Sequence, residues 1–146
     1  MLADAADVFN GKFYIHGGGW DALVVRQFPA AHPSMALAVL LSADDSEAPG
    51  QGEFRVQLVD EDGHDLGVGA AAVVGISLNP LHRPGQRSSV PIAVPFIGTR
   101  FEKPGAYEFR VFWNGTQLDP PVTFSVAAPA VTPSAAPSST SPSEPS

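Results

Sequence analysis

The residues of this chain that could do chemistry are concentrated in one acidic segment, Asp60-Glu61-Asp62-Gly63-His64-Asp65. Closely spaced carboxylates are typical of calcium loops, but the EF-hand pattern has its glycine at the sixth position and ends on a distal glutamate. Here glycine is the fourth residue. We therefore interpret the segment as a solvated hairpin turn. The sequence predicts no dedicated metal site and no cofactor, and any metal binding should be weak and use Asp60, Asp62 and Asp65.

Nucleophilic and metal-assisted catalysis have no recognisable motif in this sequence. The chain has no cysteine, which removes thiolate nucleophiles, disulfides and most structural zinc sites. No serine lies in a Gly-x-Ser-x-Gly elbow, and the histidines lack a ligand spacing such as His-Glu-x-x-His. We predict no catalytic residues and a protein that is not an enzyme. The four histidines are His16, His32, His64 and His82.

A run of three glycines and a tryptophan, Gly17, Gly18, Gly19 and Trp20, follows a short stretch of alternating residues. The run is not a phosphate loop, because the Lys-Ser/Thr ending and a following helix signal are both missing. We interpret it as a bend or bulge between two sheets, with Trp20 in the core. The alternative is close approach of a ligand or partner backbone, which makes these four residues the candidate binding site.

Composition and charge exclude several classes of partner. The chain has 146 residues, is 44% hydrophobic and carries a net charge of −7. Nucleic acid and anionic membranes require clustered Lys and Arg, and here the basic residues are scattered. No apolar run approaches the ~20 residues of a spanning helix, so membrane insertion is not expected. The first residues are acidic where a signal peptide would be basic, which predicts a cytoplasmic protein.

Short stretches of alternating apolar and polar residues recur between turn signals, without a convincing helix. Alternation with a period of two is typical of strands with one buried face. The sequence therefore predicts about eight short strands in an all-β, two-layer antiparallel β-sandwich with immunoglobulin-like Greek-key connections. The expected strands are residues 12–16, 20–28, 35–41, 53–58, 70–78, 90–96, 107–113 and 122–126.

Particular residues place some of these strands. Residues 35–41 are almost wholly apolar with small alanines on one face, which predicts a central strand covered on both faces. Pro91 and Pro95 confine residues 90–96 to a sheet edge. The prolines of residues 29–33 predict a loop, and Gly75 predicts a bulge.

Two Asn-Gly dipeptides, Asn10-Gly11 and Asn114-Gly115, predict tight hairpin turns. Residues 2–9, before the first turn, lack clean alternation.

The chain is expected to hold one domain and a tail. Residues 1–126 have enough apolar residues for a single core. Residues 127–146 are rich in Pro, Ala, Ser and Thr with one charged residue, Glu144. Such a composition cannot bury enough apolar area to offset the entropy of ordering, so the tail is predicted to be disordered and extended.

Two resemblances support the single sandwich domain. The order Phe101, Pro104-Gly105, Tyr107 resembles the tyrosine corner of immunoglobulin-like and fibronectin type III-like domains, in which the phenol bonds back to the main chain. The segments Gly11-Lys12-Phe13-Tyr14, Gly17-Gly18-Gly19-Trp20, Leu58-Val59-Asp60-Glu61-Asp62-Gly63 and Pro104-Gly105-Ala106-Tyr107-Glu108 resemble an uncharacterised bacterial family of single-domain all-β proteins. That resemblance spans residues 2–126 and implies no particular activity.

These observations favour a non-enzymatic interaction or accessory domain that contacts another protein through an exposed sheet edge or loop end. One alternative is a small-ligand or carbohydrate-binding module with Trp20, Trp113 and Tyr14 as stacking surfaces. Another is a hydrolase of unrecognised type that depends on Asp62 or His64. The sequence leaves the oligomeric state open.

Overall fold

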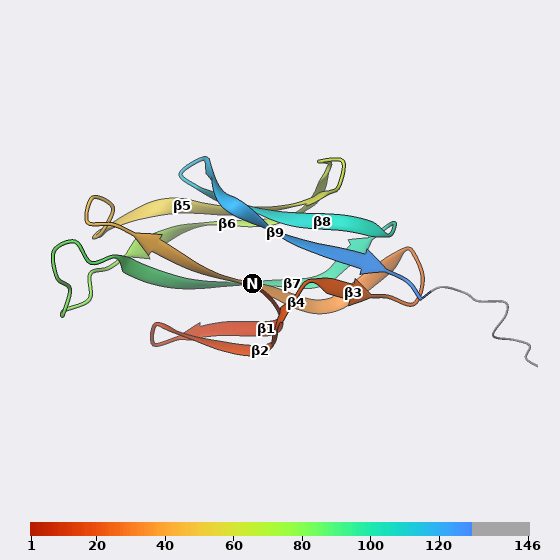
Figure 1. Cartoon of the computed structure of the whole chain (residues 1–146), viewed down its shortest axis with the longest axis horizontal. Helices are drawn as coiled ribbons and strands as arrows, with labels where there is room; N and C mark the ends of the chain where they lie inside the picture. The colour runs from red at the N-terminus through yellow and green to blue at the C-terminus, as the bar shows by residue number, and fades with distance from the viewer. Residues whose placement is uncertain (130–146) are drawn as a thin grey trace, which may run out of the picture.

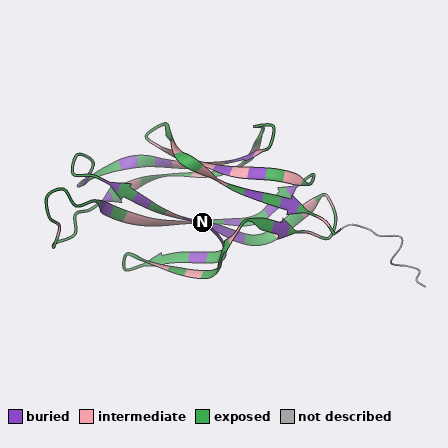
Figure 2. Cartoon of the chain, in the orientation of Figure 1, coloured by how far each residue is buried: buried purple, intermediate pink, exposed green. Residues whose placement is uncertain are grey.

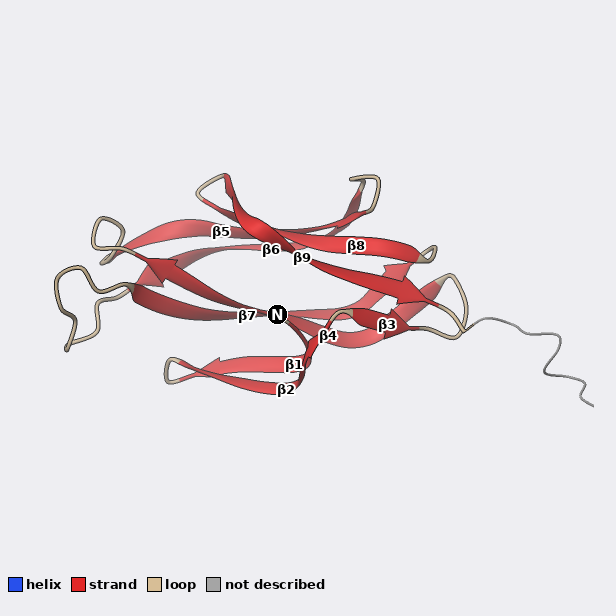
Figure 3. Cartoon of the chain, viewed as in Figure 1, coloured by secondary structure: helices blue, strands red, loops and turns tan. Residues whose placement is uncertain are grey.

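The structure, a computed structural model, describes residues 1–129. Those residues form nine β-strands and no helix (Figure 3). Within this range no helix is long and apolar enough to cross a membrane. The strands are β1 (Leu2–Phe9), β2 (Lys12–Trp20), β3 (Ala22–Val24), β4 (Ala30–Ala43), β5 (Gly50–Asp60), β6 (Asp65–Ile76), β7 (Ser88–Phe101), β8 (Gly105–Trp113) and β9 (Thr116–Ala127).

The strands form two sheets that pack face to face, as the sequence predicted (Figure 1). One sheet has the order β2-β1-β4-β7 and the other the order β3-β9-β8-β5-β6. The hairpins β1–β2, β5–β6 and β8–β9 each stay within one sheet, and the other connections between described strands cross from one sheet to the other. Nearly all pairings are antiparallel, but β3 runs parallel to β9.

Buried residues, purple in Figure 2, lie on strands of both sheets, and the aromatic ones among them pack together in the core. Phe109 is fully buried and stacks on Phe96 with ring centroids 4.9 Å apart. Phe124 lies against Phe101, Tyr107 and Phe109, with centroids 5.7 to 5.9 Å apart. Burial of this aromatic surface supplies the main driving force for folding.

Strand β4 is covered on both faces over residues 35–38, as predicted, but Leu40 on the outer face is 62% exposed. Met35 and Leu37 belong to the core between the sheets. The alanines Ala36 and Ala38 are also buried, but on the opposite face, in a cluster with Ala6 and with Phe13, Ile15 and Ala93. The covering layer is the β1–β2 hairpin, which lies beneath β4 and β7 in Figure 1. The alanines let this hairpin approach the sheet closely.

Both Asn-Gly turns have the predicted geometry. Asn10 and Gly11 have φ values of 52° and 70°, and Asn114 and Gly115 have values of 49° and 84°. Positive φ at both central positions defines the tight turn that matches the twist of a hairpin. Strand β7 lies at a sheet edge, as its prolines required.

Three local predictions were wrong. The expected strand over residues 20–28 is divided, because β2 ends at Trp20 and β3 is only three residues long. The loop expected at residues 29–33 belongs mostly to β4, which begins at Ala30. The ladder between β4 and β7 tolerates Pro33: the pair with Gly98 is missing, and the pairs on either side keep the same register. Gly75 forms no bulge, since it pairs regularly with Gln51, and the register shift occurs between Gln57 and Val59.

Residues 2–9, which showed no clean alternation, form a regular strand. Two short predicted strands, residues 35–41 and 90–96, are the centres of the fourteen-residue strands β4 and β7. The predicted tail begins at the last residue of β9, and from residue 130 it lies outside the described residues.

Candidate interaction surface

The three glycines form the bend at the base of the β1–β2 hairpin. Only Leu2 and Ala3 of β1 pair with β4, and beyond them the hairpin leaves the plane of the sheet. The pairing of β1 with β2 shifts between Leu2 and Ala3, directly opposite Gly19. Gly17 and Gly19 have φ values of 58° and 88°, which side chains with a Cβ rarely adopt. The bend turns the hairpin onto the outer face of the sheet.

Gly18 is needed for a different reason. Its φ is not in the left-handed region, but a Cβ there would lie 2.7 Å from Ile15 Cγ2 and 2.9 Å from Met1 Sδ. The close neighbours are therefore side chains and not backbone. All three glycines are exposed, and their geometry fits the bend predicted for them.

Trp20 closes the bend and packs into the core. Its ring meets Phe124 edge to face, with centroids 6.2 Å apart, and it is only partly exposed. Its Nε1 atom is buried without a hydrogen-bond partner among the described residues. Trp20 therefore belongs with the core and presents no broad stacking surface.

The outer face of the hairpin exposes two aromatic side chains among polar ones. Phe9 is 64% exposed and Tyr14 is 50% exposed. Tyr14 pairs with Asp7 across the hairpin, and Phe9 pairs with Lys12, so the two aromatic rings lie on a diagonal of the same face. Together with Val8 and Asp7 they line a shallow hollow of about 560 Å³. We call this face, with Asp7, Phe9 and Tyr14 and with Lys12 opposite Phe9, the hairpin surface.

Sequence reasoning considered Tyr14 but missed Phe9. The signal was present in the Asn10-Gly11 turn, because a two-residue hairpin fixes which residues oppose one another. Phe9 must then lie on the face of Tyr14 and opposite to the face of Phe13. Reading residues 2–9 as a strand would have given the hairpin surface.

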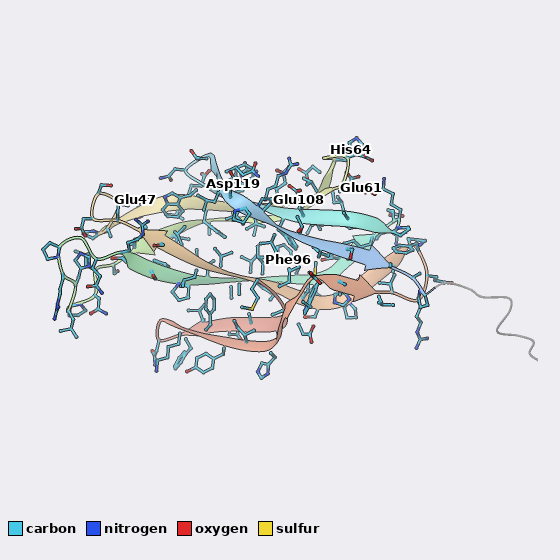
Figure 4. All side chains as sticks on the ribbon, in the orientation of Figure 1. Glu47, Glu61, His64, Phe96, Glu108 and Asp119 are labelled. Atoms are coloured by element: carbon cyan, nitrogen blue, oxygen red, sulfur yellow. The ribbon has the colours of Figure 1, made fainter. Side chains whose placement is uncertain are left out.

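The acidic segment forms the β5–β6 turn; His64 projects from its tip, whereas the Glu61 carboxylate lies next to Gly105 at the start of β8 (Figure 4). Asp60 Oδ1 accepts hydrogen bonds from the backbone N–H groups of Asp62 and His64, at 3.0 and 2.9 Å. These bonds, with the nearby His64 ring, lower the pKa of Asp60 below its usual value. Lys103 places its ammonium 3.6 Å from Asp62 Oδ2 and 4.0 Å from Asp60 Oδ2.

Ligand atoms of Asp60, Asp62 and His64 lie within 4.8 Å of one another. Asp65 is not part of this group, because its carboxylate accepts bonds from Gly67 N and Gln57 Nε2. The carboxylates thus have partners within the chain, the Lys103 ammonium among them. Hydrogen bonds that close a turn account for the cluster without a metal.

A second hydrogen-bonded group connects the loops before β5 and before β7. His82 Nε2 lies 2.7 Å from Asp45 Oδ1, and Gly85 N donates to Asp45 Oδ2 at 2.7 Å. Those bonds lower the pKa of Asp45. Arg87 reaches across to Ser42, with Nε 2.6 Å from its Oγ. The other histidines, His16 and His32, lie on β2 and β4, away from both groups.

The tyrosine corner has the form that the resemblance implied. Tyr107 is buried, and its hydroxyl donates to the carbonyl oxygen of Lys103 at 2.5 Å. Burial raises the pKa of Tyr107. The bond joins β8 to the loop after β7, and this loop also brings Lys103 to the acidic turn.

The described residues define an all-β protein of two packed sheets with an additional hairpin on the outer face of one of them. Residues 1–124 match the model of a family of unknown function, DUF6941, and the chain therefore belongs to that family. No curated protein and no solved structure matches the chain.

Proposed function

We propose that this domain is a non-enzymatic protein-interaction module and that the hairpin surface is its contact site. The observation that carries the proposal is the exposure of Phe9 and Tyr14 on one face of a hairpin whose other face is packed against the sheet. Aromatic residues are enriched at the energetic centres of protein interfaces. An exposed, adjoining aromatic pair on a well-supported scaffold is a typical anchor site.

The partner is expected to be a protein that inserts an apolar side chain between Phe9 and Tyr14 and carries basic residues around it. The hollow of about 560 Å³ is large enough for such a side chain. Asp7 lies at its border and Lys12 lies opposite Phe9, so the charge that selects a partner is that of the whole chain, −7. An acidic surface steers basic partners to it and repels acidic ones.

Two features favour binding over turnover. The most organised carboxylates, Asp45 and Asp60, have lowered pKa values and accept backbone hydrogen bonds that hold turns in place. A general base requires instead a pKa near the working pH and a substrate within reach. In addition, Asp62 lies 3.6 Å from the Lys103 ammonium and the His64 side chain is 77% exposed, so a hydrolase that uses either residue is the weaker proposal.

The carbohydrate alternative has less support than the protein partner. Its three stacking residues lie against different elements: Tyr14 on the outer face of the hairpin, Trp20 against Phe124, and Trp113 over Gly52 of β5. They do not form a single platform. Tryptophan fluorescence that changes on addition of a glycan would revive this alternative.

The test is a comparison of three immobilised proteins: the wild type, the double variant Phe9→Ser/Tyr14→Ser and the control Val24→Ser. Val24 is 73% exposed and lies on β3, so its replacement removes an exposed apolar side chain elsewhere. We expect one protein to be captured by the wild type and the control but not by the double variant. The purified partner should then bind the double variant at least tenfold more weakly, a loss of about 1.4 kcal/mol.

A partner that binds the double variant as well as the wild type would contradict the hairpin surface as the site. Turnover of a compound in a substrate panel, together with no specific partner, would contradict the interaction module itself. Melting curves of all three proteins verify that each is folded.

At the level of fold, we propose that the sandwich is an immunoglobulin-like Greek key. Support comes from the connections that cross between the sheets, from the parallel pairing of β3 with β9 and from the Tyr107 hydroxyl bond. An experimental structure in which β4 pairs with β5 in one sheet would contradict this topology.

A further inference from the structure

Strand β6 is an edge strand without the features that usually protect an edge. Among the described strands the sheets end at β2, β3, β6 and β7. Strand β3 is three residues long, β7 contains Pro91 and Pro95, and β2 carries Lys12 and the glycine bend. Residues 66–76 of β6 contain no charge and no proline. Short length, proline and charge are the usual protection against pairing with another chain, and beyond its first residue, Asp65, β6 has none of them.

Main-chain groups on one side of β6 point away from the sheet. Glu53 bonds with Asn114 through both its N–H and its C=O, so its main-chain groups face β8. The N–H and C=O groups of successive residues in a strand point to opposite neighbours. The main-chain groups of Phe54 therefore face β6, and those of its partner Ala72 face β5. Ala71 lies next to Ala72, and its N–H and C=O therefore point outward from the free edge.

The sequence of β6 is nearly symmetric about Ala71. The residues at equal distances on either side of Ala71 are, going outward, Ala70 and Ala72, Gly69 and Val73, Val68 and Val74, Gly67 and Gly75, and Leu66 and Ile76. The chain thus reads almost the same in both directions from Leu66 to Ile76. When two antiparallel copies are aligned at Ala71, each residue meets a residue of the same or similar type on the same face.

We infer that a second copy of this chain pairs antiparallel along β6, with a two-fold axis through Ala71. Ala71 would exchange both main-chain hydrogen bonds with its counterpart, and Gly69 would do the same with Val73 of the second copy. Val68 and Val74 would meet on the inner face. The two five-stranded sheets would become one continuous sheet, which is an isologous interface.

Charge and chain composition favour a second copy over other occupants. Each copy has a net charge of −7, so two copies repel over most of their surfaces. The uncharged residues 66–76 let them meet without opposing like charges. The chain beyond residue 129 is a poor occupant, because Pro133, Pro137, Pro142 and Pro145 interrupt any ladder of donors.

The pairing should be limited in length. Gly67 has a φ of 75° and departs from extended geometry, so the shared ladder should end near Val68 and Val74. A short ladder of small side chains buries a modest area, and the dimer should dissociate on dilution. Outer-face residue Val73, which is 69% exposed, would be partly covered.

The test introduces a single thiol at the proposed axis. Because the chain has no cysteine, the thiol of Ala71→Cys can pair only with its counterpart in a second copy. Directly opposed, hydrogen-bonded residues have Cα atoms about 5.5 Å apart, within the range of a disulfide. We expect mild oxidation to give a covalent dimer of Ala71→Cys and little or none of Val24→Cys, the control on the opposite edge of the same sheet.

Sedimentation gives an independent measurement on the wild-type chain. It should show a monomer–dimer equilibrium that depends on concentration, and Ala71→Pro, which removes an outward donor only, should be monomeric with an unchanged circular dichroism spectrum. A wild type that stays monomeric at all concentrations, or equal cross-linking at positions 24 and 71, would overturn the inference. Neither result bears on the hairpin surface, which lies on the other sheet.

Discussion

The two faces of β4 are packed by opposite means. On the inner face, Met35 and Leu37 meet the large aromatic side chains that separate the two sheets. On the outer face, Ala36 and Ala38 allow the hairpin to lie almost against the backbone. Large side chains bury more apolar area and stabilise more, whereas small ones allow close approach. The sandwich is therefore the stable part of the molecule, and the hairpin is a thinner layer added to it.

The first way to test this contrast is to remove an aromatic ring from the inner layer. Phe109→Ala should lower the free energy of unfolding by about 3–5 kcal/mol, because it leaves a cavity among Phe96 and Phe124. Urea denaturation measures the loss. A loss of less than about 1 kcal/mol would be smaller than truncation of a core aromatic residue normally causes. It would mean that the interior is loosely packed.

The second way is to enlarge a side chain in the outer layer. Ala36→Leu should lower the free energy of unfolding by about 2–3 kcal/mol, because the hairpin leaves no room for added methylenes. Leu40→Ala is the matched control on the same face of β4, where Leu40 is 62% exposed, and it should change stability by about 0.5 kcal/mol at most. Equal effects of the two changes would show that the hairpin does not pack on β4.

The glycine bend gives a smaller effect. Gly18→Val should cost about 1–2 kcal/mol, since Ile15 and the flexible Met1 side chain must move. Gly75→Ala, where an added Cβ meets nothing within 4 Å, should be neutral or slightly stabilising. Thermal unfolding measures both. A Gly18→Val protein that melts like the wild type but no longer captures a partner would make the bend itself a binding site.

The smallest effect concerns pH and lies outside both layers. Asp60 has a lowered pKa in the folded state, so the folded chain retains the carboxylate where the unfolded chain, with a pKa of about 3.9, becomes protonated. Its contribution to stability is present above that value and is lost as the pH falls through the folded pKa. The difference in melting temperature between the wild type and Asp60→Asn should shrink over this acid range. A constant difference would contradict a role for the Asp60 charge.

Sequence patterns were sufficient for the sandwich and its turns. Alternation identified the core strand with Phe109, and the Asn-Gly dipeptides fixed two hairpins, because these signals are local. The burial of Ala36 on a second face was also predictable, since an uninterrupted apolar strand needs cover on both sides. The glycines were correctly read as a bend, but not as the bend that lays a hairpin over the sheet.

The remaining features depend on distant contacts. Pro33 is tolerated in β4 only because Gly98 of β7 lies opposite, and nothing near Pro33 in the sequence indicates that partner. The division between β2 and β3 follows from the transfer of the chain from one sheet to the other. The Asn10-Gly11 turn was enough to place Phe9 and Tyr14 on one face, but not to show that this face is exposed, because an exposed aromatic residue alternates in the same way as a buried one.

The pairing of β4 with β7 has a consequence for how the chain folds. Ala30 pairs with Phe101 and Ala43 with Ser88, so the strands that join are separated by the whole of β5 and β6. Closing so distant a pair is slow, whereas the β1–β2 hairpin connects neighbours through a two-residue turn and forms quickly. During synthesis, β4 must therefore wait for β7 with one edge unpaired. The hairpin, which forms first, can cover the alanine face of β4 in that interval and so shield it from other chains.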